Sequence, residues 1–159
     1  MKKMLIAIDG SQCALKAVDY VGRQFSGVDD LLITLLHVLP YPPAPLWDDG
    51  HIPTKEEKEG RDNAIETWLK VQRSKAEGIF GKAVDILTSN GFSAHQIEKK
   101  TVSDSTDVAS SILEETRDKG YQTLIVGRCG HSRTKQFIIG SVTMKIISHG
   151  AGVAICVVE

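Results

Sequence analysis

Short, continuously apolar segments alternate with longer amphipathic segments along the whole chain, and this alternation constrains the fold more than any other feature. Segments 4–8 and 31–38 are apolar on both faces, which is typical of strands buried inside a parallel sheet. Segments 121–126 and 153–158 repeat this pattern, whereas 95–102 alternates only weakly, as an edge strand does. The chain therefore contains five candidate strands.

Helical patterns fill the intervals between these strands. Apolar residues recur at helical spacing in four segments: 12–25, 54–90, 104–119 and 135–149. Gly78 and Gly81 weaken the longest of them and leave a break there open. The strict alternation predicts an α/β fold, an open doubly wound five-stranded parallel sheet with helices on both faces. We expect one domain that spans residues 1–159.

The charge balance argues against nucleic acid and membrane surfaces as partners. Lys and Arg number 19 against 20 Asp and Glu, so the net charge is −1, and aromatic residues make up only 6% of the chain. The apolar run after the first two lysines stops at Asp9, too early for a signal peptide, and no segment approaches the roughly 18 apolar residues of a membrane span. We therefore expect a cytoplasmic protein.

The cysteines are three in number and far apart: Cys13, Cys129 and Cys156. Their odd number and the lack of a Cys-x-x-Cys pair argue against a disulfide framework and a zinc site, and favour a reducing compartment. Cys129 lies in a cationic loop beside His131, so a reactive thiol is conceivable, but we interpret it as a bystander. The segment Asp48-Asp49-Gly50-His51 resembles part of a hard-metal site and is more simply a turn.

A segment with regularly placed glycines follows the strand that ends at Val126. It reads Gly127-Arg128-Cys129-Gly130 and continues to Gly140-Ser141. Glycines let backbone N–H groups approach an anion, and a helix that begins near Gly140 would present its positive end to phosphate. The alternative is purely structural, since such glycines also relieve turns and close helix–sheet contacts.

Three strand ends could meet at one cleft, because ligands bind open parallel sheets at the carboxyl ends of their strands. Asp9, Val38 and Gly127 occupy these three ends. The sequence here resembles the universal stress protein family. The resemblance rests on Asp9-Gly10-Ser11, on His37-Val38, and on the motif G-x2-G-x9-G-S, matched by Gly127, Gly130, Gly140 and Ser141.

The resemblance implies a domain of the adenine nucleotide alpha hydrolase type that binds ATP with Mg²⁺. Val38 would meet the adenine through its backbone, and Asp9 would lie beside the ribose or the metal–phosphate region. Gly127 and Gly130 would border the ribose and phosphates, and the residues that follow Gly140 would hold the phosphate tail. The candidate nucleotide-binding residues are Asp9, Gly10, Ser11, Val38, Val126, Gly127, Arg128, Gly130, His131, Ser132, Gly140, Ser141 and Val142.

Three functions stay open under this resemblance. The first is an ATP-binding regulatory module with little or no hydrolysis, dimerising through the last strand, Val153–Val158, as the family usually does. The others are an interaction dimer with an empty pocket and a slow ATP hydrolase. No catalytic residue and no protein metal ligand can be assigned, since no positioned base is evident. The chain departs from the family at Ser103-Asp104-Ser105, where a glycine is common. These residues could alter the edge of the cleft or cap the next helix, and we interpret them as a helix cap.

Overall fold

The computed structural model describes residues 1–46, 50, 52–129, 139–150 and 152–159. Its strands are β1 (Lys2–Ala7), β2 (Leu31–Val38), β3 (Ile97–Val102), β4 (Thr123–Gly127) and β5 (Ala154–Val158). Its α-helices are α1 (Gln12–Gln24), α2 (Lys55–Ser89), α3 (Val108–Asp118) and α4 (Ser141–His149), with short 3-10 turns at η1 (Ala44–Leu46) and η2 (Ala94–Gln96). All strand pairs are parallel, so the predicted fold class is confirmed.

The sheet reverses its direction of growth at β1. The strand order is β3-β2-β1-β4-β5, so the chain builds outward from β1 to one edge and then returns to build the other. Such a reversal opens a crevice between the carboxyl ends of the two strands that flank it, here β1 and β4. The same order makes β3 an edge strand, as predicted, and β5 the opposite edge.

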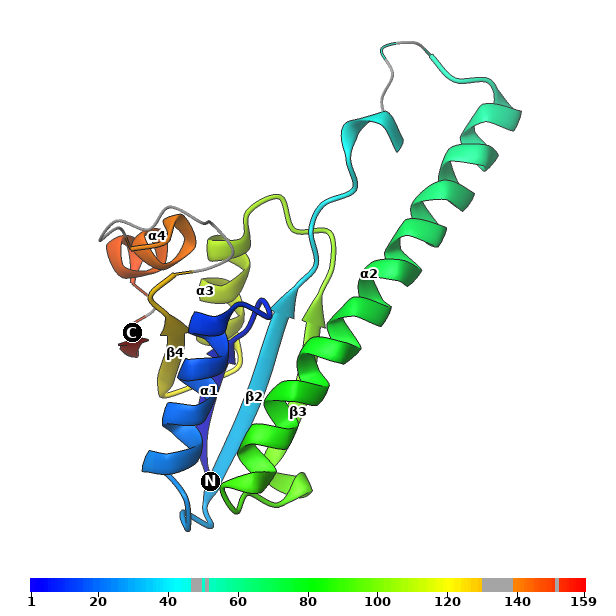
Figure 1. Ribbon diagram of the computed structural model, residues 1–159. Helices are drawn as coiled ribbons and strands as arrows, with labels where there is room; N and C mark the ends of the chain where they lie inside the picture. Colours follow the sequence, from blue (N-terminus) through cyan, green and yellow to red (C-terminus); the bar gives the residue numbers. More distant parts are fainter. Residues whose placement is uncertain (47–49, 51, 130–138, 151) are drawn as a thin grey trace.

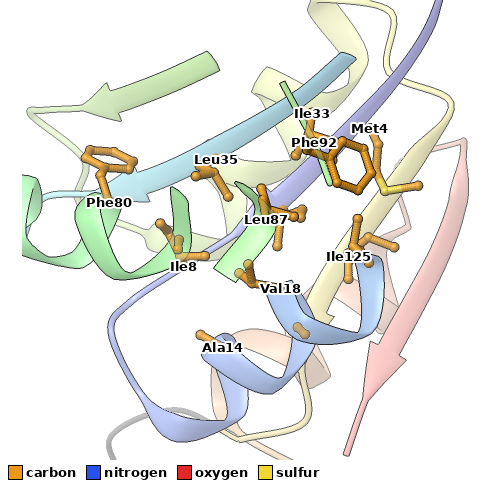
Figure 2. Packing of buried hydrophobic residues seen from close by; sticks show 14 of the residues in the cluster. Met4, Ile8, Ala14, Val18, Ile33, Leu35, Phe80, Leu87, Phe92 and Ile125 are labelled. Carbon is orange, nitrogen blue, oxygen red and sulfur yellow. The ribbon is translucent and has the colours of Figure 1, made fainter. Parts of the chain in front are cut away.

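In the described part of the chain, two helices cover each face of the sheet. The face under α1 and α2 packs one apolar cluster, in which Ile8, Val18, Leu35 and Leu87 are buried (Figure 2). The other face packs a second cluster against α3 and α4, with Ile112 and Ile146 at its centre. The predicted arrangement of helices on both faces is therefore observed (Figure 1).

Helix α2 is far longer than the strands it covers. Its 35 residues correspond to about 52 Å at 1.5 Å per residue, and it runs without a break through Gly78 and Gly81, so the predicted possible break is absent. Thr54 begins it with a capping box to Glu57. Its buried residues, Ala76, Phe80, Ala83 and Leu87, all lie in its second half, and the first half extends beyond the sheet (Figure 1).

Two helices begin later than the sequence pattern predicts. Asp107 is the N-cap of α3, and Asp104 precedes it with φ of 61°, a left-handed conformation that Asp tolerates better than most residues. The interpretation of residues 103–105 as a cap is therefore wrong. Helix α4 begins at Ser141 rather than near residue 135, and residues 130–138 lie outside the described part of the chain.

Within the described residues, none of the helices has the length and apolar character needed to cross a membrane. The cytoplasmic location expected from the sequence stays a prediction.

Candidate functional site

A cavity of about 240 Å³ opens at the carboxyl ends of β1, β2 and β4. Its floor comes from the strand ends, through Ile8, Leu36 and Val126, and its walls come from α3 and α4. Val108 and Val142 flank it from the two helices and stay 37% and 36% exposed. Solvent-exposed apolar side chains around a cavity are typical of a ligand site, because a bound ligand buries them.

Asp9 brings the carboxylate that lines this cavity. Its Oδ1 accepts a hydrogen bond from the Ser11 N–H at 2.9 Å, and Ser11 Oγ accepts one from the Ala14 N–H at 3.2 Å. Ser11 is therefore the N-cap of α1. Gly10, between Asp9 and Ser11, has a φ of 82°, and a Cβ at this position would lie 3.0 Å from the Ile79 side chain. This turn fixes Asp9 where β1 ends and α1 begins.

Val38 extends β2 beyond the end of β1. Successive residues of a strand direct their N–H and C=O groups to opposite sides. Leu36 C=O accepts from the Ile8 N–H, while the Leu39 N–H donates to Val102 in β3. Val38, two residues after Leu36, therefore directs its backbone groups toward the side of β1. Because β1 ends at Ala7, these groups face the cavity rather than a neighbouring strand.

Gly127 ends β4 in contact with α1. A Cβ at this position would lie 2.6 Å from the carbonyl carbon of Cys13, so only glycine fits there. Its carbonyl accepts a hydrogen bond from Thr143 Oγ1 of α4 at 2.9 Å. The next residue, Arg128, is held from two sides, because its N–H donates to Val158 and its C=O accepts from the Gly140 N–H.

The start of α4 faces the same cavity. Gly140 is its N-cap and has no side chain with which to cap the helix, while Ser141 and Val142 supply the first turn. The first N–H groups of a helix have no partner within it, and the helix dipole places partial positive charge there. An anion is the chemical group that such a helix end accepts best.

An ion pair joins the two helices of the cavity wall. Lys145 Nζ of α4 donates to Asp107 Oδ2 at the start of α3, and Ser110 Oγ donates to the same oxygen at 2.6 Å. The hydrogen bond from Lys145, followed by that from Ser110, lowers the pKa of Asp107 from 3.8 to about 2. The Asp107 carboxylate therefore stays ionised and paired at neutral pH, and it connects α3 to α4 beside Val108.

The structure brings most of the described candidate residues to this cavity. Seven line it: Asp9, Val38, Val126, Gly127, Gly140, Ser141 and Val142. Gly10, Ser11 and Arg128 lie next to it and shape its rim through the backbone contacts above, whereas Gly130, His131 and Ser132 lie outside the described residues. Sequence reasoning missed Val108 and Ile112, which line the cavity from α3.

The cysteine prediction was wrong for two of the three residues. Cys13 and Cys129 form a disulfide across a sequence separation of 116, and only Cys156 is free. Their distance along the chain hid this pairing, but β1 and β4 are neighbours, so Cys129, two residues after the end of β4, lies beside the first turn of α1. Cys129 is therefore no bystander thiol, and it also lines the cavity.

Metal ligands from the protein are few at this site. The described residues contain no group of three or more His, Cys, Asp or Glu side chains that could hold a metal ion. Asp48, Asp49 and His51 lie outside those residues. Among the described cavity residues, Asp9 supplies the one carboxylate, a hard oxygen ligand of the kind that Mg²⁺ prefers.

Sequence comparison relates this chain to known proteins. The model of the universal stress protein family matches residues 1–152. The universal stress protein YxiE of Bacillus subtilis (strain 168) is 28% identical over 149 residues, which cover 91% of this chain and 90% of that protein.

Two solved structures have the same fold. A universal stress protein from Archaeoglobus fulgidus in complex with dAMP has a TM-score of 0.64 at 14% identity, covering 100% of this chain and 98% of its own. A universal stress protein family protein from Arabidopsis thaliana with AMP bound has a TM-score of 0.64 at 16% identity, covering 99% of this chain and 91% of its own. At these identities the likeness concerns the fold alone.

Proposed function

The chain belongs to the universal stress protein family, and we propose that its cavity binds an adenine nucleotide as the input of a regulatory module. The observation that carries this proposal is the convergence of Asp9, Val38 and the start of α4 on one cavity at the point where the sheet reverses. The dAMP and AMP held by the two structures of the same fold support an adenine nucleotide as the ligand class.

The apolar part of the cavity suits the base. Leu36 and Ile112 are among its apolar lining residues, and Val38 also lines it. We expect the base to lie against these side chains with its edge toward the backbone N–H and C=O of Val38. An adenine edge offers both a donor amino group and acceptor ring nitrogens, so it can pair with both backbone groups at once. The cavity volume of about 240 Å³ is below the roughly 300–1,000 Å³ of pockets that enclose a whole drug-sized ligand. We expect the base and ribose to fill it.

The phosphates would lie at the start of α4. Ser141 and Val142 present backbone N–H groups there, since the Gly140 N–H is already donated to the Arg128 carbonyl oxygen, and the Ser141 hydroxyl can add a hydrogen bond. We propose ATP with Mg²⁺ as the physiological ligand. Bound Mg²⁺ neutralises phosphate charge, and Asp9 would hold it directly or through water. Gly130, His131 and Ser132, which belong to the same glycine motif in the sequence, remain proposed phosphate contacts.

The proposal contains no catalytic step. Hydrolysis needs a base placed to activate water, and among the described cavity residues Asp9 is the one carboxylate, already accepting a hydrogen bond from the Ser11 N–H. We propose instead that the protein forms a homodimer through β5 and that partner proteins recognise its nucleotide-bound form. An open edge strand such as β5 favours pairing with a second copy.

Calorimetric titration with AMP, ADP and ATP, with and without Mg²⁺, tests the proposal. Ser141→Glu places a carboxylate at the start of α4, and we expect it to weaken binding about tenfold or more, or roughly 1.4 kcal/mol. Ser74→Glu makes the same change on the exposed surface of α2 and serves as the matched control. Equal affinity in both variants would place the phosphates elsewhere, and no binding of any nucleotide would contradict the function itself.

A further inference from the structure

The Cys13–Cys129 disulfide joins two segments that the fold already holds together. The Cα atoms of the two residues are 5.7 Å apart, well inside the range that a disulfide spans. Gly127 packs on the Cys13 backbone, and Ser11 Oγ lies 3.5 Å from the Cys129 carbonyl oxygen, to which it donates. Both cysteines are half-buried, so small reagents can reach them. The pair is therefore placed to form and to open without rearrangement of the sheet.

A short chain of contacts leads from this pair to the anion-binding end of the cavity. Cys129 follows Arg128, whose carbonyl oxygen accepts a hydrogen bond from the Gly140 N–H at 2.9 Å. Gly140 is the N-cap of α4. On the other side, Gly127 accepts from Thr143 in the first turn of the same helix. A bond that fixes Cys129 to α1 therefore also restrains residues 127–129, and through them the start of α4 at Gly140 and Ser141.

We propose that Cys13 and Cys129 form a reversible redox pair that sets the affinity of the cavity for its nucleotide, with a peroxide as oxidant and a dithiol as reductant. The inference deepens the proposed function and rests on it for the affinity readout. The thiol chemistry itself can be measured without any nucleotide.

The oxidation balances as a two-electron step. Cys13 lies in the first turn of α1, where the helix dipole favours a thiolate, so its sulfur attacks the peroxide. The O–O bond breaks, a sulfenic acid forms and one hydroxide leaves, taking a proton to become water. The Cys129 sulfur then attacks the sulfenic sulfur, forming the S–S bond and releasing a second water. In the reverse direction, the two thiols of a dithiol displace the protein sulfurs in turn and become a disulfide themselves.

The oxidised form should be the tighter binder. With the disulfide closed, residues 127–129 and the start of α4 are held in the binding geometry before the ligand arrives, so less conformational freedom is lost on binding. With the disulfide open, the nucleotide must order this rim itself. We expect the dissociation constant to rise about three- to tenfold on reduction.

The state of the pair is read by counting thiols. Protein treated with hydrogen peroxide or with dithiothreitol is denatured, labelled with a maleimide and weighed by mass spectrometry. We expect three labels after reduction and one after oxidation, at Cys156, which is the free cysteine. The variant Cys156→Ser should give two labels and none. Three labels in the peroxide-treated protein would overturn the redox pair.

The coupling to the cavity is read by titrating both forms with AMP and with Mg-ATP. The variant Cys13→Ser removes the bond without altering a residue that lines the cavity, and it should bind with the affinity of the reduced protein in either buffer. Cys156→Ser should retain the full difference between buffers. If the oxidised and reduced proteins bind equally well, the switch is disproved while the nucleotide site stands. If neither form binds any nucleotide, both the proposed function and its redox control are disproved. The number of maleimide labels then shows only whether Cys13 and Cys129 form a reversible disulfide.

Discussion

Gly127 packs so closely on α1 that a Cβ at this position would lie 2.6 Å from the carbonyl carbon of Cys13 and 2.7 Å from its carbonyl oxygen. The neighbouring atoms belong to the backbone of the first helical turn, and they cannot move aside as a side chain can. The first glycine of the G-x2-G-x9-G-S motif is therefore needed for the contact between β4 and α1, in addition to any contact with a ligand.

The variant Gly127→Ala should be less stable than the wild type. A methyl group forced against backbone typically costs about 1–3 kcal/mol. Urea unfolding followed by circular dichroism, in one fixed redox buffer, measures this loss. The matched control is Gly81→Ala in α2, where a Cβ meets nothing within 4 Å. This control should gain about 0.5–1 kcal/mol, because alanine loses less entropy in a helix. Similar unfolding midpoints for Gly127→Ala and the wild type would contradict the packing argument.

The strands were predictable because their apolar runs end at charged or breaking residues. The run 31–38 corresponds to β2 residue by residue, since Asp30 precedes it and Pro40 follows it closely. Helix starts were less predictable. Polar residues at 103–107 offer several competing caps, and only the observed backbone selects Asp107.

The site was predictable where a motif marks it and invisible where it depends on packing. Asp9, Val38 and Gly140 follow from their places at strand and helix ends. Val108 and Ile112 do not, because an apolar helix stripe looks the same whether it faces a sheet or a ligand. The disulfide was missed because only the strand order brings Cys13 next to Cys129.

Removing the charge of Asp9 should separate metal binding from base binding. In Asp9→Asn the amide oxygen can still accept from the Ser11 N–H, so the turn is kept while the carboxylate is lost. We expect Mg-ATP affinity to fall about tenfold, or roughly 1.4 kcal/mol, and AMP affinity to change little. Titration of both ligands at fixed Mg²⁺ measures this. The matched control is Asp104→Asn, an exposed residue outside the cavity with the same charge change. An equal loss for AMP and Mg-ATP would assign Asp9 to the ribose.

The link between α3 and α4 should be visible in a carboxylate titration. The Lys145 ammonium, with Ser110, lowers the pKa of Asp107 to about 2. Because the folded-state pKa lies below the unfolded value, the pair stabilises the fold fully above pH 4 or so, and this contribution is lost as the pH falls from about 4 to about 2. In Lys145→Met we expect the pKa to rise toward the ordinary 3.8. Carbon-detected NMR of the Asp107 carboxyl reads the titration in both proteins. An unchanged pKa would show that Lys145 does not pair with Asp107 in solution.

The open edge at β5 should decide the oligomeric state. Val157 is 37% exposed on this edge strand, and Val153 and Ile155 pack inward against the cluster under α3 and α4. A lysine at an edge opposes pairing with a second strand, since its charge would be desolvated in the interface. We therefore expect wild-type protein to sediment as a dimer and Val157→Lys as a monomer. Val71→Lys places the same charge at an exposed apolar position on α2 and should leave the dimer intact. A Val157→Lys protein that still sediments as a dimer would exclude the β5 edge as the interface, and a wild-type monomer would remove the dimer from the proposed function.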